Sequence, residues 1–266
     1  PTRCSDGPAV AITATPTPAG TYTYVWTVPD GVADPGNVST FDATVEGEYS
    51  VQITSTLGCI AEGSGTLKVV DAPDAGDDGD VTVCDSSDDV IDLFSLITGE
   101  DAGGVWTRSS GSGGTFDAAM GTFIPAPGAS TSTFSYTVPA DEPCVEDASI
   151  ATVNINAQPD AGDDGDVTVC DSSDDVIDLF SLISGEQAGG VWTRSSGSGG
   201  TFDAAMGTYI PAPGASTSTF TYTLSAEAPC VEDASVATVN INAQPDAVDD
   251  GDVTVCDSSD DVIDLF

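Results

Sequence analysis

The sequence contains no histidine and only four lysine and arginine residues, against 44 aspartate and glutamate residues. Without histidine, serine–histidine and cysteine–histidine catalysis and histidine-bound zinc are excluded. So few cations cannot neutralise phosphates, which excludes binding to nucleic acid and attraction to an anionic membrane surface. No run of 18 apolar residues occurs, so the sequence predicts no membrane span. We expect a protein that is not an enzyme.

The rest of the composition favours a folded β protein. Hydrophobic residues make up 39% of the 266 and the mean hydropathy is +0.03, so apolar surface is available for burial despite a net charge of −40. Short apolar or alternating runs are separated by turns rich in glycine, serine and proline, and no long helix is indicated. The predicted strands of one unit are 80–84, 90–94, 104–108, 122–125, 133–138 and 149–157. This pattern predicts an all-β protein, a tandem array of antiparallel Ig-like β-sandwich domains.

An internal repeat organises the chain. Residues 74–159 return as 160–245, an offset of 86 at which 77 positions are identical, and a third copy occupies 246–266. Since the third copy stops less than a quarter of the way through the unit, we expect the chain to be a window onto a longer array. The alternative is that 246–266 complete a neighbouring subunit. The predicted domains are 1–72, 73–158, 159–244 and the truncated 245–266.

Seven cysteines recur with the repeat, two in each complete unit and at a nearly constant spacing. The simple interpretation is one disulfide within each sandwich, and free buried cysteines are the alternative. Paired cysteines in an acidic chain indicate an oxidising, extracellular or cell-surface location. The predicted pairs are Cys4–Cys59, Cys84–Cys144 and Cys170–Cys230, with the partner of Cys256 beyond the end of the sequence.

Carboxylates cluster where one unit joins the next. Several neighbouring carboxylates repel one another, and Ca²⁺, which takes six to eight oxygen ligands, relieves that repulsion. The spacing is not that of an EF-hand, so the prediction rests on density and position. The alternative is a solvated acidic linker that keeps the chain soluble. The Ca²⁺ candidates are Asp77, Asp78, Asp80, Asp88, Asp89, Asp163, Asp164, Asp166, Asp174, Asp175, Asp249, Asp250 and Asp252, with Glu146 and Asp147 as alternative ligands from a nearby loop.

Two resemblances add to these expectations. The Tyr24-x-Trp26 strand and the Gly47-x-Tyr49-x-Val51 strand that leads to Gly58-Cys59 resemble the polycystic-kidney-disease (PKD) type of Ig-like sandwich. The repeat resembles those of giant cell-surface adhesins of Bacteroidetes, of the Flavobacterium kind. The matching segments are Val83-Cys84, Ile91–Phe94, Gly103–Trp106, Gly114–Phe116, Phe134–Tyr136 and Pro143-Cys144. The second resemblance implies a long filament or stalk, often exported by the type IX system and associated with gliding motility.

The leading functional hypothesis is therefore structural, an extracellular filament or adhesin stalk whose partners are neighbouring repeats or copies of itself. One alternative is a binding module in which repeat loops such as Ser109–Gly114 recognise surface glycans. Another is a fibril subunit that polymerises by donating the strand within 246–266. Paired carboxylates also suit glycoside hydrolysis, but no aromatic sugar platform accompanies them.

Overall fold

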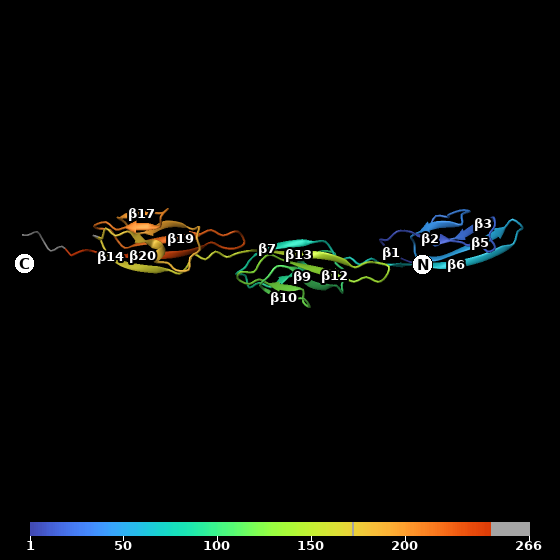
Figure 1. Ribbon diagram of the computed structural model, residues 1–266, viewed down its shortest axis with the longest axis horizontal. Coiled ribbons are helices and arrows are strands. Elements are labelled where there is room, and N and C mark those ends of the chain that lie inside the picture. The colour runs from blue at the N-terminus through green and yellow to red at the C-terminus, as the bar shows by residue number, and fades with distance from the viewer. Residues whose placement is uncertain (172, 246–266) are drawn as a thin grey trace, which may run out of the picture. The chain divides into compact units, whose positions relative to one another are not determined.

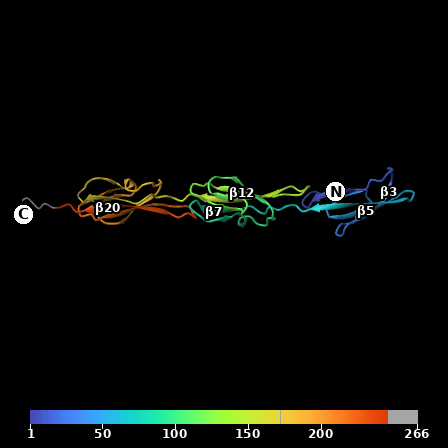
Figure 2. The same ribbon diagram turned by 90° about the horizontal axis from the view of Figure 1, so that it is seen from below.

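The computed structural model describes residues 1–171 and 173–245. Its strands form three sandwiches, coloured from blue to orange along the chain in Figure 1, with a second view in Figure 2. Residues 1–158 and 227–230 form one compact unit, and the remaining described residues belong to a second. The expected all-β class and the antiparallel sandwich architecture are confirmed. The predicted domain boundaries stay a prediction, and 246–266 lie outside the described residues.

The first sandwich packs two sheets around Leu67 and Tyr49, both almost fully buried. The Tyr49 hydroxyl donates to the carbonyl of Val45 at 2.7 Å, the tyrosine-corner arrangement of Ig-like folds, and burial raises the pKa of this phenol. The sheets have the strand orders β1-β6-β5-β3 and β2-β4, and β1 is parallel to β6. The strands are β1 (Thr2–Cys4), β2 (Val10–Thr13), β3 (Tyr22–Thr27), β4 (Thr40–Ala43), β5 (Gly47–Ser55) and β6 (Ile60–Val70).

The second sandwich has sheets of order β7-β13-β12-β9 and β10-β11-β8. Its strands are β7 (Gly79–Cys84), β8 (Ile91–Asp92), β9 (Val105–Ser110), β10 (Thr115–Asp117), β11 (Thr122–Ile124), β12 (Ser132–Val138) and β13 (Asp147–Asn156). Alternate residues of β12 are buried and half-buried, as a strand with one face on the core requires. A 3₁₀ turn, η1 (Leu93–Ser95), occupies the second half of the segment 90–94 that was predicted as a strand. The short strand β10 was not predicted.

The third sandwich repeats this arrangement, with orders β14-β20-β19-β16 and β15-β18-β17. Its elements are β14 (Gly165–Cys170), β15 (Ile177–Asp178), η2 (Leu179–Ser181), β16 (Val191–Ser196), β17 (Thr201–Asp203), β18 (Thr208–Ile210), β19 (Ser218–Leu224) and β20 (Asp233–Asn242). In both repeats the first strand is parallel to the last, so the two strands end side by side. This pairing places Cys84 beside Asn156 and Cys170 beside Asn242.

Aromatic side chains form much of the core of the repeat. Phe94 packs edge-on against Trp106 and Tyr136, with ring centroids 5.4 and 5.3 Å apart, and Phe134 contacts Phe116 and Phe123. Such geometries add to the stabilisation that burial alone provides.

The single arginine of each repeat acts as a backbone anchor. Arg108 lies over the rings of Phe123 and Phe134 and donates to the carbonyl of Gly113 at 2.8 Å and to the hydroxyl of Ser132 at 2.6 Å. This cation therefore secures the 110–114 loop against the core.

We predict that Gly79→Ala destabilises the second sandwich by about 1–3 kcal/mol, because an added methyl group would overpack the start of β7. A Cβ at this position would lie 1.8 Å from the carbonyl oxygen of Leu96. Hydrogen–deuterium exchange should show lost protection in peptides that cover β7 and β13. The control is Gly63→Ala in β6, where a Cβ meets nothing within 4 Å and protection should be unchanged. Equal effects of the two substitutions would contradict this packing.

Candidate functional site

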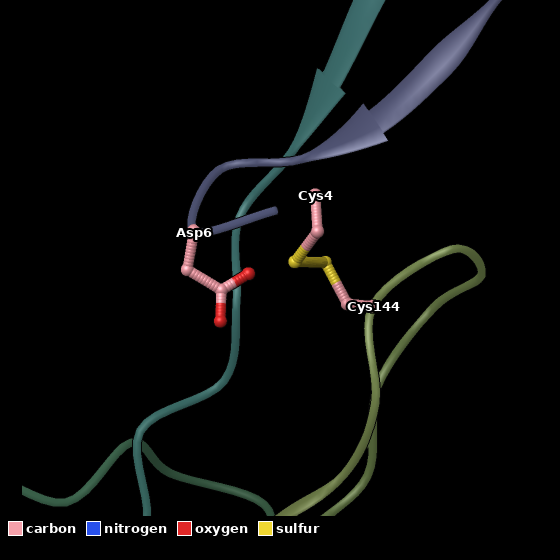
Figure 3. A group of neighbouring side chains, drawn as sticks. All are labelled: Cys4, Asp6 and Cys144. Carbon is pink, nitrogen blue, oxygen red and sulfur yellow. A yellow bond between two sulfur atoms is a disulfide. The ribbon is translucent and has the colours of Figure 1, made fainter. Parts of the chain in front are cut away.

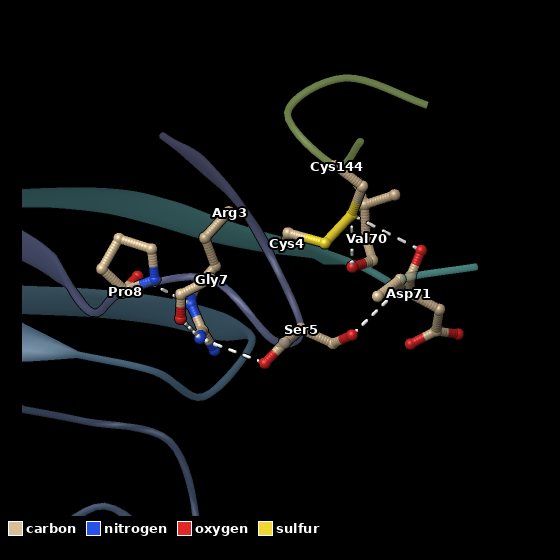
Figure 4. Close-up of a disulfide and its surroundings, with 9 residues drawn as sticks. Arg3, Cys4, Ser5, Gly7, Pro8, Val70, Asp71 and Cys144 are labelled. Carbon is tan, nitrogen blue, oxygen red and sulfur yellow. Dashed lines mark hydrogen bonds between the residues drawn. A yellow bond between two sulfur atoms is a disulfide. The ribbon is translucent and has the colours of Figure 1, made fainter. Parts of the chain in front are cut away.

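The first candidate site surrounds Cys4, the last residue of β1. Because β1 is parallel to the end of β6, Cys4 lies beside Val70, and both strands stop at the same edge. Cys4 is bonded to Cys144 of the second sandwich, with the Cα atoms 4.9 Å apart (Figure 4). The Cys144 Sγ lies 3.5 Å from the carbonyl oxygens of Val70 and Asp71. The β12–β13 hairpin of one sandwich is therefore fastened to the end of the preceding sheet.

A buried arginine holds the loop that follows Cys4. Arg3 is 8% exposed, and its guanidinium donates to the carbonyls of Pro8 at 3.2 Å, Ser5 and Gly7 (Figure 4). It also donates to the carbonyl of Thr44 at 2.8 Å. The Ser5 hydroxyl accepts from the backbone N–H of Ala72 at 2.8 Å, which ties this loop to the linker. The site is thus supported from its own sandwich.

The second candidate site surrounds Cys84 at the end of β7. Cys84 is bonded to Cys230, with Cα atoms 5.0 Å apart. The Nδ2 of Asn156 donates to the carbonyl of Ala228 at 2.8 Å, and the Cys230 Sγ lies 3.4 Å from the Asn156 carbonyl oxygen. The hairpin tip 227–230 belongs to the same compact unit as residues 1–158. Asn156 therefore contacts the incoming hairpin next to the disulfide.

A carboxylate supports the second site as Arg3 supports the first. Asp85 is 8% exposed, and its two oxygens accept from the backbone N–H groups of Gln158 at 2.8 Å and Gly128 at 2.9 Å. A charged acceptor with two backbone donors makes stronger bonds than a neutral one. Asp85, which directly follows Cys84, thereby links the end of β7 to the backbone that follows β13.

The predicted disulfide pairing is wrong. Cys4–Cys59, Cys84–Cys144 and Cys170–Cys230 do not form, and both bonds join the first cysteine of one sandwich to the second cysteine of the next. The reason is strand length. Cys84 lies beside the end of β13 and Cys144 lies just before its start, so ten residues of strand separate them by about 30 Å. A disulfide needs Cα atoms within about 7 Å.

Two thiols remain within the described residues. Cys59 and Cys170 are both free and exposed. Cys59 occupies the β5–β6 hairpin, where its N–H donates to the Ser55 hydroxyl at 3.1 Å. Cys170 ends β14 beside Asn242. Cys256 lies outside the described residues.

The predicted calcium ligands that the structure describes are exposed, and most of them are bonded within their own sandwiches. Asp78 accepts from the N–H of Ile150 at 2.7 Å, Asp80 from the Asn154 side chain at 3.3 Å, and Asp89 from the Ser87 hydroxyl at 3.2 Å. Asp77 pairs through its backbone with Thr98. Asp164, Asp166, Asp175 and Asp163 repeat these contacts in the third sandwich, and Asp88 and Asp174 lie on exposed loops.

Within residues 1–171 and 173–245, no three of these carboxylates bring oxygens within 4.8 Å of one another. The alternative ligand Asp147 accepts from the N–H of Ala75 at 2.8 Å. Asp249, Asp250 and Asp252 lie outside the described residues. Ca²⁺ binding therefore stays a prediction that rests on the sequence.

The structure does bring Asp6 close to Cys4 and Cys144, with one ligand-type atom of each within 4.8 Å of the others (Figure 3). The two sulfur atoms are bonded to each other, so neither is the thiolate that a metal ion requires. Only the exposed Asp6 carboxylate remains as a ligand, and this group is not a candidate metal centre.

A groove with a volume of about 530 Å³ lies on the first sandwich. Its lining residues are mostly apolar, among them Ile12, Trp26 and Val51, and Glu62 is the one carboxylate in the lining. A lone exposed carboxylate without a partner base does not make a catalytic pair. Within the described residues, no helix is long and hydrophobic enough to cross a membrane.

Comparisons with known proteins found likenesses of structure alone. No protein-family model matches the sequence, and no curated protein matches it. The I-band fragment I67–I69 of titin is 12% identical with a TM-score of 0.44, covering 88% of this chain and 94% of that one. The insect immune protein hemolin is 11% identical with a TM-score of 0.38, covering 88% and 72%, and the extracellular cadherin domains 3–6 of protocadherin gamma B2 are 12% identical at 0.37, covering 91% and 70%. These identities and TM-scores are too low to assign a fold or a function. The fold assignment therefore depends on the strands described above.

We predict that cutting the linker between the first two sandwiches leaves the chain covalently whole. With a protease site inserted between Ala72 and Pro73, Cys4–Cys144 still joins the two pieces. Mass spectrometry should find one species before reduction and two afterwards. In Cys4→Ser the pieces should separate without reductant. If the pieces of the unsubstituted chain separated without reductant, the result would contradict the Cys4–Cys144 bond and support disulfides within each sandwich.

We predict that Asp171 stabilises the third sandwich in a pH-dependent way. Backbone N–H groups of Gln244 and Gly214 donate to this carboxylate and lower its pKa. Because the folded pKa lies below the unfolded one, the stabilisation is complete above the ordinary carboxyl range near pH 4 and is lost as pH falls below it. Asp171→Asn should lower the melting temperature at pH 7, and this effect should shrink progressively as pH falls below about 4 and through the lowered folded pKa. Asp174→Asn, on an exposed loop, is the control, and a pH-independent effect of Asp171→Asn would contradict the assignment.

Proposed function

We propose that this chain is a structural segment of an extracellular stalk or filament that carries mechanical load. The observation that supports it best is the pair of disulfides that fasten each sandwich to the next, Cys4–Cys144 and Cys84–Cys230. Disulfides persist in oxidising surroundings, which supports a secreted or surface location. Nearly identical units in series provide length, and length is what a stalk needs.

The finer parts of the proposal come from the resemblance and the composition. The repeat's likeness to Bacteroidetes adhesins supports a bacterial cell surface and a role in adhesion. A net charge of −40 keeps such a chain soluble and discourages association side by side. Calcium at the acidic joints would add stiffness, and this part of the proposal rests on the clustering of carboxylates in the sequence.

The positions of the two disulfides give the load-bearing role a physical basis. When the second sandwich unfolds under tension, a chain without disulfides would release the whole segment from Val70 to Pro159. With the bonds, two shorter covalent routes connect the first sandwich to the third. One runs from Val70 to Cys84 and continues through the Cys84–Cys230 bond. The other passes through the Cys4–Cys144 bond and runs from Cys144 to Pro159. At about 3.5 Å per residue, the released length is about 50 Å instead of about 310 Å. Either disulfide alone is enough to keep the released length short.

Single-molecule force spectroscopy tests the role directly. We expect the unsubstituted chain to show a short extension when the second sandwich unfolds, and Cys4→Ser and Cys84→Ser each to keep it short. The double variant Cys4→Ser/Cys84→Ser should release about six times more length, by the ratio of the two routes. Long extensions in the unsubstituted chain would refute a load-bearing role for the disulfides.

A further inference from the structure

The two disulfides hold two joints that are built alike. We call the site of the Cys4–Cys144 bond the first joint and the site of the Cys84–Cys230 bond the second joint. At each joint, a cysteine that ends a first strand is bonded to a cysteine in the hairpin before the last strand of the following sandwich. The two joints can therefore be compared residue by residue.

The receiving strand carries a different side chain at each joint. Val70 and Asn156 occupy equivalent places, since each lies beside the cysteine that ends the parallel first strand. Their carbonyl oxygens lie 3.5 and 3.4 Å from the hairpin sulfur. The Nδ2 of Asn156 also donates to the carbonyl of Ala228 at 2.8 Å, whereas valine has no polar side-chain atom. The second joint therefore has a side-chain hydrogen bond that Val70 cannot make at the first.

The hairpins differ from each other more than the rest of the repeat does. Residues 74–159 and 160–245 are identical at 77 positions, and four of the nine differences fall within the five residues 138–142. These four are Val138/Leu224, Pro139/Ser225, Asp141/Glu227 and Glu142/Ala228. Since one hairpin meets the first sandwich and the other meets the second, the repeats differ most where their partners differ.

The position two residues before the hairpin cysteine differs in charge between the joints. It is Glu142 at the first joint and Ala228 at the second, while the residue that follows the strand cysteine changes in the opposite sense, from Ser5 to Asp85. Asp85 donates its backbone N–H to the carbonyl of Asn156 at 2.9 Å, and Asn156 in turn contacts Ala228. A glutamate at 228 would bring a second carboxylate towards that of Asp85, which is 8% exposed, and like charges repel each other. The second joint is therefore unsuited to the hairpin of the first.

We propose that Asn156 and Asp85 are specificity-determining residues for the formation of the second disulfide. Asn156 binds the Ala228 carbonyl before the bond exists, and Asp85 disfavours a hairpin with a carboxylate at this position. The partner they fit is a proline–cysteine hairpin that has a small, uncharged residue before its proline. Docking of this hairpin raises the local concentration of Cys230 at Cys84. This role concerns how the bond is formed, so it does not depend on the proposed load-bearing function.

Oxidation completes the docked pair, with a small-molecule disulfide such as oxidised glutathione as the oxidant. The Cys230 thiolate attacks one glutathione sulfur, which forms a mixed disulfide and releases one glutathione thiolate. The Cys84 thiolate then attacks the Cys230 sulfur and displaces the second glutathione. Two protein thiols are oxidised, one glutathione disulfide is reduced to two thiols, and the two protons pass to the released thiolates.

Docking without the bond can be measured in the full chain with Cys84→Ser, by iodoacetamide alkylation and peptide mapping. A docked Cys230 should be alkylated more slowly than the exposed thiol of Cys59, because Cys230 is only 9% exposed at the joint. Adding Asn156→Val should accelerate the alkylation of Cys230 by about two- to ten-fold, the effect of one hydrogen bond. Asn154→Val is the matched control, since that side chain lies two residues earlier on β13 and donates within its own sandwich.

A variant that adds a contact separates docking from a general weakening of the fold. Val70→Asn places an amide at the first joint, where the carbonyl of Glu142 corresponds to that of Ala228. In the full chain with Cys4→Ser, it should slow the alkylation of Cys144 by about two- to ten-fold. Lys68→Asn, two residues earlier on β6, is the control and should leave this rate unchanged.

The role of Asp85 is tested by charge. In the Cys84→Ser chain, Ala228→Glu should accelerate the alkylation of Cys230, and adding Asp85→Asn should reduce that acceleration because one of the two carboxylates is then gone. An acceleration by Ala228→Glu that persists in full after Asp85→Asn would overturn the role of Asp85.

Two further results would overturn the proposal. One is an equal rate of Cys230 alkylation in Asn156→Val and Asn154→Val. The other is a rate of Cys144 alkylation that Val70→Asn leaves unchanged.

Discussion

The last strand of each sandwich determines how the whole chain is held together. It runs the length of its sheet, with one cysteine beside its end and the other just before its start. About 30 Å of extended backbone separates these two sulfur atoms, so they cannot meet within one folded sandwich. Each can reach only a cysteine of another sandwich. The length of the last strand thus explains why the disulfides join consecutive sandwiches.

The scarcity of basic residues explains much of the local chemistry. Arg3, Arg108 and Arg194 donate mainly to backbone carbonyls, so they anchor loops and do not neutralise the acidic surface. Aspartates take the complementary part, because Asp85, Asp78 and their repeats accept hydrogen bonds from backbone N–H groups. Some carboxylates of the acidic clusters therefore stabilise the fold by accepting backbone hydrogen bonds, and a count of charges does not show which ones.

Much of the fold could be predicted from the sequence, because strand alternation and turn residues are local signals. The predicted strand 149–157 corresponds to β13, whose inward-facing residues join the core of the repeat. The three-residue β10 was missed because so short a segment has no measurable period. The other predicted strands differ from the observed bounds by one or two residues, as at 90–94, where the strand β8 is only Ile91–Asp92.

The cysteine pairing could not be predicted from spacing. In a repeat, disulfides within one sandwich and disulfides between consecutive sandwiches both recur at regular sequence separations. The cysteines of one unit recur at a nearly constant spacing, and so do the bonded pairs, at sequence separations of 140 and 146. The deciding fact is the parallel pairing of first and last strands, a long-range contact without a local signal. One clue was present, since Cys144 precedes a long predicted strand that separates it from the far end of its sheet. Likewise, the density of aspartates did not show which backbone donors they would bond.

The position of the sulfur atoms also imposes an order on biosynthesis. A sandwich that folds as the chain emerges holds its two thiols too far apart to react with each other, which protects it from premature closure. Its first thiol, Cys84 for example, must wait until the hairpin with Cys230 has been synthesised and has folded. Oxidation therefore trails synthesis by more than one whole unit, and the growing end of such a chain is always chemically reactive.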